Sequence, residues 1–301
     1  MQSDARLDSR LGLNVPSEWW TSAPMLKEIE ASGFSWVQLP APPESVLMDA
    51  RNCIRHSRAV AAALPRGLRR VLHAPAELIA GTGEADRALT GALSYAAECG
   101  AECVVYHARS IPDGAGAEDR LLAESRSLAR LAPTAERLGV SIALENLAPV
   151  FPGPETISAN PLSLRSLARR IASPAVGLCL DLGHANVIAG LRRTSLTRMV
   201  EPVLDTVLLF HVHDNLGARW RPGDLRPDLD PLRLDLHLVP GRGTIEWTEV
   251  NESLAAHDAP LMLEVHPPRP ASREIREVAA ATLTAVRRDA PRSASPQRSP
   301  A

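Results

Sequence analysis

Eight short apolar runs recur along this chain, and a longer stretch with helical periodicity separates each run from the next. Apolar runs of this length are typical of strands that are buried on both faces of a parallel sheet. The intervening stretches repeat apolar residues at the spacing of an amphipathic helix. This alternation predicts consecutive βαβ units. The runs cover residues 11–15, 34–39, 70–74, 103–107, 140–145, 176–181, 207–213 and 261–265.

Eight strand-helix units in this length match the size of a closed barrel. A doubly wound open sheet is the rival, but the first run lacks the GxGxxG phosphate loop of that fold. We therefore predict an α/β protein with one domain, a (β/α)8 TIM barrel over residues 11–289. Residues 1–10 are predicted to be flexible, and the Pro/Ser/Arg-rich tail 290–301 to be disordered. The predicted helices cover residues 24–32, 44–64, 84–100, 118–138, 161–172, 195–205, 248–257 and 272–289.

Charge and composition exclude several classes of protein. The 33 basic and 35 acidic residues give a net charge of −2, which argues against coating nucleic acid by bulk charge but leaves room for a local basic groove. No signal peptide and no membrane-spanning apolar run are visible, and the 4 cysteines form no CxxC pair. These features predict a protein of the cytoplasm with free thiols.

Polar residues that can bind metal stand at the ends of the apolar runs, where barrels of this kind carry their active sites. Glu145 and Asp181 each end a run, and Glu264 lies next to the end of the last one. Three carboxylates that converge in a narrow barrel mouth repel one another, and a cation relieves that repulsion. Mixed imidazole and carboxylate ligands predict Zn²⁺, Mn²⁺, Co²⁺ or Fe²⁺. Seven of the 9 histidines also lie at these ends: His73, His107, His184, His211, His213, His237 and His266.

Two spacings support a shared ion. Asp235 and His237 are two residues apart and lie on one face of the chain if it is extended. Asp181 and His184 are three apart, and we expect a turn at Gly183 to fold both side chains toward one metal.

Several motifs resemble one known group of barrels, the xylose-isomerase-like TIM-barrel superfamily. The motifs are LENL, CLDLGHA, FHVHDN, DLHLVPGRGTIEW and LEVH, in that order. The superfamily includes sugar and sugar-phosphate isomerases and epimerases, and also endonuclease IV-type nucleases that cut abasic DNA. The resemblance covers residues 11–286.

The resemblance implies a set of metal ligands. In the isomerases and epimerases four ligands hold one metal, and they match Glu145, Asp181, His211 and Glu264. The nuclease branch binds three metals, so the resemblance implies one to three divalent ions per chain. The nine ligands of that branch match His73, His107, Glu145, Asp181, His184, His211, Asp235, His237 and Glu264.

The preferred function is a metal-dependent isomerase or epimerase of a sugar, sugar phosphate or keto-polyol. The metal would polarise a carbonyl, and Glu145 and Glu264 would transfer a proton through an enediolate, as the resemblance to 3-epimerases implies. His184 would bind a substrate oxygen. Dehydration of the substrate through the same enediolate is equally compatible with these residues. The expected partner is a small carbohydrate, and the resemblance also allows a homo-oligomer.

Two other functions stay open. One is a phosphodiesterase that acts on abasic DNA with a metal-activated hydroxide. The segment GTIEW, however, resembles the epimerase-like members of the superfamily more closely than the nuclease branch. The other is a barrel whose site is vestigial. Arg242 departs from both branches and either binds a substrate anion or faces solvent. The long segments 149–160 and 216–243 are predicted to form lids or site walls. Trp19 and Trp20 are expected to cover a sugar ring or to pack in the core.

Overall fold

The structure is a computed structural model that describes residues 7–15, 23–111, 116–149, 156–218, 234–265 and 273–289, with side chains as far as residue 283. Its strands are all parallel and close into a barrel in chain order, which confirms the predicted TIM barrel. The strands are β1 (Leu11–Asn14), β2 (Trp36–Pro40), β3 (Arg69–His73), β4 (Cys103–Tyr106), β5 (Ser141–Glu145), β6 (Val176–Asp181), β7 (Val207–Val212) and β8 (Leu261–Leu263).

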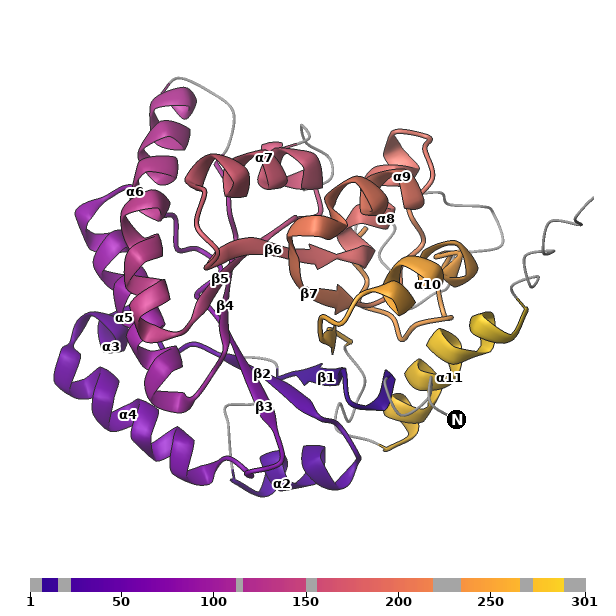
Figure 1. The fold of residues 1–301 in the computed structure, drawn as a ribbon, viewed down its shortest axis with the longest axis horizontal. Coiled ribbons are helices and arrows are strands. Elements are labelled where there is room, and N and C mark those ends of the chain that lie inside the picture. The colour runs from indigo at the N-terminus through magenta and orange to yellow at the C-terminus, as the bar shows by residue number, and fades with distance from the viewer. Residues whose placement is uncertain are drawn as a thin grey trace, which may run out of the picture.

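Helices surround the ring of strands (Figure 1). The α-helices are α2 (Ala23–Ala31), α3 (Glu44–Met48), α4 (Ala50–Ala63), α5 (Gly83–Cys99), α6 (Ala117–Leu138), α7 (Pro161–Ile171), α8 (Leu182–Leu191), α9 (Thr197–Val200), α10 (Trp247–Ala256) and α11 (Arg273–Asp289). Two 3-10 helices, η2 (Ile157–Ala159) and η3 (Glu201–Thr206), lie between them.

Local chemistry explains where the helices begin and end. The Thr82 side chain accepts a hydrogen bond from the Ala85 backbone and caps the start of α5, and Gly100 ends that helix with φ +69°. Asn160 caps α7, whose first residue is Pro161. Such ends fix the short connections that bring each helix back against the strands.

Two apolar clusters hold the barrel together. The larger one fills the space between the strands and the helices. The smaller one lies in the barrel interior, where side chains pack against one another as the core of the barrel. Cys179 belongs to this interior cluster, in agreement with a packing role. The interior residues are Trp36, Val71, Cys103, Val105, Ala143, Cys179, Leu209 and Met262.

Two predicted helices are interrupted. The stretch 44–64 forms α3 and α4, because Asp49 adopts an extended conformation and its side chain caps α4 by accepting from the backbone of Arg51 and Asn52. The stretch 195–205 forms α9 and the 3-10 helix η3.

The prediction of a turn at Gly183 was wrong. Leu182 begins helix α8 directly after β6, and Asp181 is the residue that caps it. Helix α8 is buried on nearly all sides, so its sequence LGHANVIAGL shows no polar face. A helix of this kind lacks the periodicity by which an amphipathic helix is recognised.

The predicted ends of the domain fall partly within the described residues. Leu7 and Arg10 are buried, and Arg10 Nε donates a hydrogen bond to the Ala259 carbonyl at 2.7 Å. The tail 290–301 lies outside the described residues, as do His266, Trp19 and Trp20 and the parts 150–155 and 219–233 of the two long segments.

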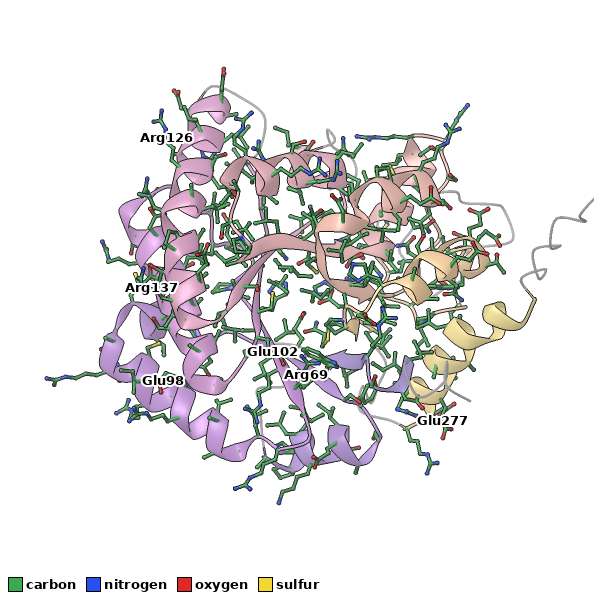
Figure 2. All side chains as sticks on the ribbon, viewed as in Figure 1. Arg69, Glu98, Glu102, Arg126, Arg137 and Glu277 are labelled. Atoms are coloured by element: carbon green, nitrogen blue, oxygen red, sulfur yellow. The ribbon has the colours of Figure 1, made fainter. Side chains whose placement is uncertain are left out.

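Charged side chains project from the outer helices, among them Arg126 and Arg137 on α6 and Glu277 on α11 (Figure 2). At the edge of the barrel, Arg69 Nε and Nη2 donate to the two carboxylate oxygens of Glu102 at 2.7 and 2.6 Å. None of the helices in the described part of the chain is long and apolar enough to span a bilayer.

Candidate metal centre

The predicted site residues gather at the carboxyl ends of strands β3 to β8 and on the segment before α10. Seven of the nine predicted ligands line a cavity of about 380 Å³, and Asp181 and His211 are the two that do not. All nine predicted ligands lie in this region, within four groups whose donor atoms are no more than 4.8 Å apart. Those groups are His73/His107/Glu145, Glu145/Asp181/His211/Glu264, Glu145/Cys179/His211 and His184/His213/Asp235/His237.

The residues Glu145, Asp181, His211 and Glu264, which we call the inner group, converge on one imidazole nitrogen. His211 Nδ1 lies 3.2 Å from Glu145 Oε1, 3.4 Å from Glu264 Oε1 and 3.6 Å from Asp181 Oδ2. Asp181 and His211 are completely buried. These positions follow from the register, since β6 pairs Asp181 with His211 on β7.

The two carboxylate oxygens of Asp181 have different surroundings. Its Oδ1 accepts a hydrogen bond from the His184 backbone at 2.7 Å, which caps α8. Its Oδ2 has no hydrogen-bond partner among the described residues and faces His211. The helix cap therefore fixes the carboxylate and leaves one oxygen directed at the inner group.

Glu145 joins the inner group to a pair of histidines. Its Oε2 lies 3.3 Å from both His73 Nε2 and His107 Nε2, while its Oε1 faces His211. The His73 and His107 rings meet edge to face, with centroids 4.9 Å apart. One carboxylate thus presents an oxygen to each of two neighbouring groups.

Backbone carbonyls orient three of the imidazoles. His73 Nδ1 donates to the Ala74 carbonyl, His184 Nδ1 to the Asn146 carbonyl and His237 Nδ1 to the Glu264 carbonyl, each at 2.7 Å. A proton held on Nδ1 leaves the Nε2 lone pair of each ring directed into the site. Histidines that ligate metals are oriented in this way.

Gln38 also contacts the inner group, and it was not among the predicted site residues. Its Oε1 accepts a hydrogen bond from His211 Nε2 at 2.9 Å, and its Nε2 donates to Glu264 Oε1 at 2.9 Å. Gln38 is completely buried on β2. A polar residue within the apolar run 34–39 was the signal that could have identified it.

The carboxylates and imidazoles shift one another's pKa. Burial alone would raise the pKa of Glu145, but the His211 and His107 imidazoles outweigh it and hold that pKa well below its usual range. Burial likewise opposes ionisation of Asp181, whose pKa His184 and His213 lower. Burial lowers the pKa of His184, yet Asp181 and Asp235 raise it overall. These surroundings therefore favour the ionised forms of Glu145 and Asp181.

The residues of the inner group fit a divalent metal. Glu145 Oε2 and Asp181 Oδ2 are buried and have no hydrogen-bond partner among the described residues. Buried carboxylate oxygens without donors are costly unless a cation or a proton neutralises them. One imidazole nitrogen and three carboxylates form a donor set that Mn²⁺, Fe²⁺, Co²⁺ and Zn²⁺ accept.

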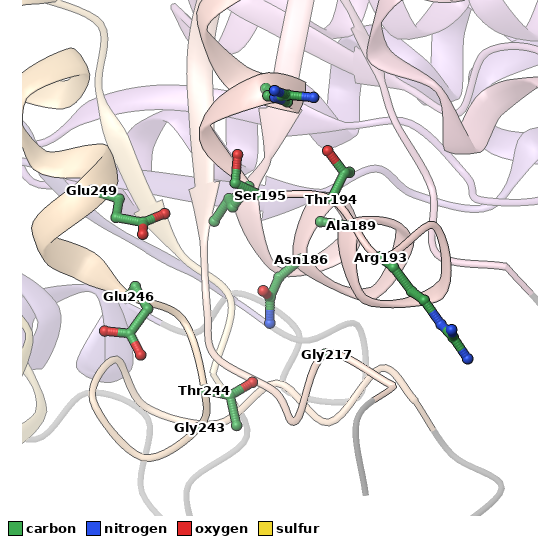
Figure 3. Close-up of a pocket in the computed structure, with 12 residues that line it drawn as sticks. Asn186, Ala189, Arg193, Thr194, Ser195, Gly217, Gly243, Thr244, Glu246 and Glu249 are labelled. Carbon is green, nitrogen blue, oxygen red and sulfur yellow. The ribbon is translucent and has the colours of Figure 1, made fainter.

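A second, larger cavity of about 710 Å³ lies between α8, α9 and the start of α10 (Figure 3). Its lining includes Asn186, Ser195 and Glu249 but none of the predicted ligands, so we place the site in the smaller cavity. Arg242 is exposed and lines neither cavity. His257 lies outside both cavities and donates from Nε2 to the Leu204 carbonyl at 3.1 Å.

Comparisons with known proteins agree with this fold. The uncharacterized protein MJ1311 of Methanocaldococcus jannaschii is 30% identical over 193 residues, which span 61% of this chain and 59% of that relative. Among solved structures, a D-tagatose 3-epimerase-like protein has a TM-score of 0.68 at 22% identity and covers 93% of this chain and 98% of its own.

Two further structures are similar. The TTHB071 protein from Thermus thermophilus, soaked with ZnCl2, has a TM-score of 0.62 at 23% identity over 92% of this chain and 97% of its own. A D-psicose 3-epimerase has a TM-score of 0.63 at 13% identity over 92% of this chain and 98% of its own. The family model described as xylose isomerase-like TIM barrel matches residues 26–283. The chain belongs to the xylose isomerase-like TIM barrel family.

Proposed function

We propose that this protein is a divalent-metal-dependent isomerase or epimerase of a small polyhydroxy carbonyl compound. One observation carries the proposal. Glu145 ends strand β5 and Glu264 directly follows strand β8; both line the 380 Å³ cavity, and they lie 3.2 and 3.4 Å from the same His211 Nδ1. A cavity of this volume suits a small ligand. The similarity to structures named as sugar epimerases supports the same proposal.

The inner group would hold the metal through Glu145, Asp181, His211 and Glu264. A divalent ion bound there would polarise the substrate carbonyl and so acidify the neighbouring C–H group. The carboxylates of Glu145 and Glu264 would then exchange the proton. One accepts it as the C–H electron pair moves into an enediolate, and the other returns a proton to carbon. His184, which also lines the cavity, would hold a substrate oxygen.

The proposal is tested with a panel of ketoses, ketose phosphates and keto-inositols, incubated with metal-loaded and with chelator-treated protein. Nuclear magnetic resonance follows the appearance of epimers or isomers. We expect turnover of at least one compound by loaded protein only, and a loss of about 100-fold or more in Glu264→Gln, since a general acid-base group contributes about 10²- to 10⁴-fold. Glu252→Gln, an exposed carboxylate on α10, is the matched control and should keep full activity. Turnover that survives Glu264→Gln contradicts the assigned role.

Phosphodiester hydrolysis is a second candidate, and one observation favours it. Besides the inner group, the cavity region holds the donor groups His73/His107/Glu145 and His184/His213/Asp235/His237, so it offers more metal-binding side chains than one metal needs. Neighbouring metals can together activate a water and stabilise a leaving oxygen. Metal-loaded protein that cleaves a duplex at a single abasic site, with cleavage lost in Glu145→Gln, would establish this function. No cleavage by protein shown to hold metal would reject it.

A further inference from the structure

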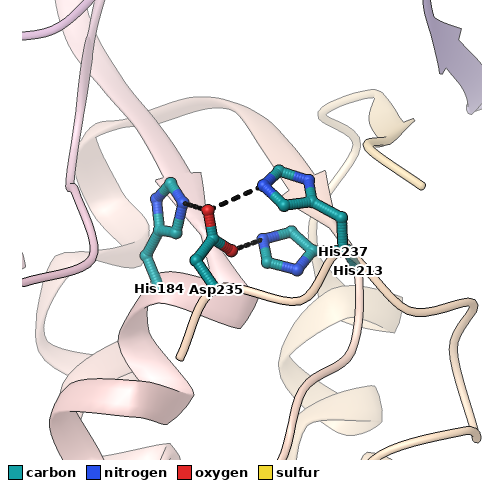
Figure 4. A group of neighbouring side chains, drawn as sticks. All are labelled: His184, His213, Asp235 and His237. Carbon is teal, nitrogen blue, oxygen red and sulfur yellow. Dashed lines mark hydrogen bonds and ion pairs between the residues drawn. The ribbon is translucent and has the colours of Figure 1, made fainter. Parts of the chain in front are cut away.

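His107 is held differently from other histidines of the site. The Nδ1 atoms of His184 and His237 donate to backbone carbonyls, and their Nε2 atoms face the Asp235 carboxylate (Figure 4). Among the described residues no backbone carbonyl accepts a hydrogen bond from the His107 ring, whose Nε2 lies 3.3 Å from Glu145 Oε2. The position of this ring therefore depends on the segment of chain that carries it.

Glu124 on helix α6 holds the chain on both sides of His107. Tyr106 is the last residue of β4, and its hydroxyl donates to Glu124 Oε1 at 2.8 Å. The Arg109 backbone N–H donates to the same oxygen, also at 2.8 Å. One carboxylate oxygen thus accepts a hydrogen bond from the residue before His107 and another from the second residue after it.

The chain has an unusual conformation at Arg109, two residues after His107. Its φ of +55° lies in the left-handed region, which a residue other than glycine adopts only at a cost in energy. Such a conformation persists where the surrounding contacts impose it. The Arg109 backbone N–H is held by Glu124, and its side chain also turns toward α6, where Nη2 lies 3.5 Å from Ser125 Oγ. Both contacts are made with α6.

Glu124 has little freedom to move, because it is completely buried. The Tyr106 hydroxyl that donates to it also accepts from the Ala80 backbone N–H at 2.9 Å, so the segment that precedes α5 joins the same network. That segment packs directly on α6, since a Cβ atom on Gly81 would lie 2.9 Å from the Glu124 backbone nitrogen. Three segments of the chain therefore fix the carboxylate in place.

A buried carboxylate is a costly group at this position. Glu124 Oε2 has no hydrogen-bond partner among the described residues. An apolar side chain of similar size would avoid that cost. It would also leave the Tyr106 hydroxyl and the Arg109 N–H without this acceptor. The hydrogen bonds to Oε1 are therefore what the carboxylate contributes to the structure.

We propose that Glu124 is a positioning residue for His107 and, through His107, for Glu145. Glu124 fixes the turn after β4, and this turn places the His107 ring beside Glu145 Oε2. His107 and Glu145 line the 380 Å³ cavity, whereas Glu124 does not and acts from outside it. The part that concerns Glu145 rests on the function proposed above, in which Glu145 transfers a proton. The part that concerns His107 is independent of that function.

Nuclear magnetic resonance of the histidine rings tests the part on His107, and it needs neither metal nor substrate. The full chain is labelled with ¹³C at histidine Cε1 and treated with chelator, and its signals are assigned with single histidine-to-glutamine variants. Glu124→Met keeps the length of the side chain but removes the acceptor. We expect it to shift the His107 signal by more than its linewidth and to leave the signals of His184 and His237 in place. A general loss of structure would move all three.

Three further variants sharpen this test. Glu124→Gln keeps a carbonyl oxygen that can accept both hydrogen bonds, so it should return the His107 signal to its original position. Glu118→Met removes an exposed carboxylate from the same helix and should move no signal. Tyr106→Phe removes one of the two hydrogen bonds and keeps the ring. It should shift the His107 signal by less, and it replaces Glu124→Met if that variant does not fold.

Kinetics test the part on Glu145, with a compound that the panel described above identifies as a substrate. We expect Glu124→Met to lower kcat by about 10- to 100-fold, the usual effect of losing a residue that orients a group of a metal site, with little change in KM. His107→Gln should cause a similar loss. Adding Glu124→Met to His107→Gln should cause no further loss, because residues that act through one contact are not additive.

Three results would overturn the proposal. They are a His107 signal that stays in place in folded Glu124→Met, a shifted signal that Glu124→Gln does not restore, and losses in kcat that multiply in the double variant. If no compound is turned over, the proposed function fails, and the resonance spectra still decide whether Glu124 positions His107.

Discussion

Gln38 Oε1 accepts a hydrogen bond from His211 Nε2 at 2.9 Å. This contact directs the other ring nitrogen, Nδ1, toward the carboxylates of Glu145 and Glu264. Gln38 also donates to Glu264 Oε1, so one amide orients two residues of the inner group. It connects β2, which supplies none of the proposed ligands, to the centre of the site.

Replacing Gln38 should weaken metal binding without removing a ligand. Gln38→Met keeps the length of the side chain but removes its hydrogen bonds to His211 and Glu264, together with a third from Gln38 Nε2 to Asn14 Oδ1 at 3.1 Å. We expect metal affinity at the inner group to fall by about 10- to 100-fold, the usual effect of losing a residue that orients a ligand. Competition with a chromophoric chelator measures the affinity. An unchanged affinity in a folded variant would show that Gln38 does not orient His211.

Asp214 should be essential for the fold of the segment that leads into α10. Its buried carboxylate accepts four hydrogen bonds, from the backbone of Asn215, Ile245 and Gly241 at 2.9, 3.2 and 2.9 Å and from Trp247 Nε1 at 3.1 Å. Asp214→Asn turns one acceptor oxygen into a donor that faces N–H groups. We expect the free energy of unfolding to fall by about 2–3 kcal/mol. Urea titration measures it, with Glu252→Gln as control; a loss below the error of the titration contradicts the assigned role.

Gly183 should tolerate no larger residue, because the His213 ring occupies the space of its Cβ atom. Gly183→Ala is expected to destabilise the protein by about 1–3 kcal/mol, as overpacking of a core does. Gly83 at the start of α5 is the matched control. Among the described residues its Cβ would meet only Arg87 Nη1, at 3.8 Å, so Gly83→Ala should leave the stability intact. Equal behaviour of the two variants would refute the steric argument.

Glu124 should make stability depend on pH. This buried carboxylate on α6 accepts from the Tyr106 hydroxyl and the Arg109 backbone, both at 2.8 Å, but burial outweighs these contacts and raises its pKa. A carboxyl whose pKa is higher in the folded state stabilises the fold fully below its unfolded pKa, near about 4.3. That contribution is lost as the pH rises through the folded pKa.

The measurement compares unfolding free energies of the unaltered protein and Glu124→Gln from about pH 4.5 to about pH 8, a range chosen to begin near the unfolded pKa. Glutamine resembles the protonated carboxyl and does not titrate in this range. We expect the unaltered protein to lose stability relative to Glu124→Gln as the pH rises. A difference that stays constant, or that changes in the opposite direction, would show that the pKa of Glu124 is not raised.

The strands could be predicted from sequence because each is buried on both faces and reads as an apolar run. The position of the ligands followed from the same pattern, since residues such as Glu145 and Asp181 stand where a run ends. Parallel strands of a barrel bring such ends together whatever their separation along the chain. The pattern therefore predicted the location of the site together with the fold.

What the sequence could not supply depends on contacts between distant residues. Helix α8 was missed because burial on all sides removes the amphipathic signal. The break at Asp49 depends on a capping side chain that helical periodicity does not register. Gln38 and His213 acquire their surroundings only when β2 and β7 meet the rest of the ring. Their contacts are properties of the closed barrel.

The most direct test of the central claim is hydrogen exchange at the carbon next to the carbonyl, followed in D2O with metal-loaded protein. We predict that the unaltered protein introduces deuterium into both substrate and product. Glu145→Gln and Glu264→Gln, if they retain metal, should each stop interconversion, and each should still exchange only the compound whose hydrogen faces the remaining carboxylate. Metal-loaded protein that exchanges no α-hydrogen in any compound of the panel, while it cleaves an abasic duplex, would contradict the account.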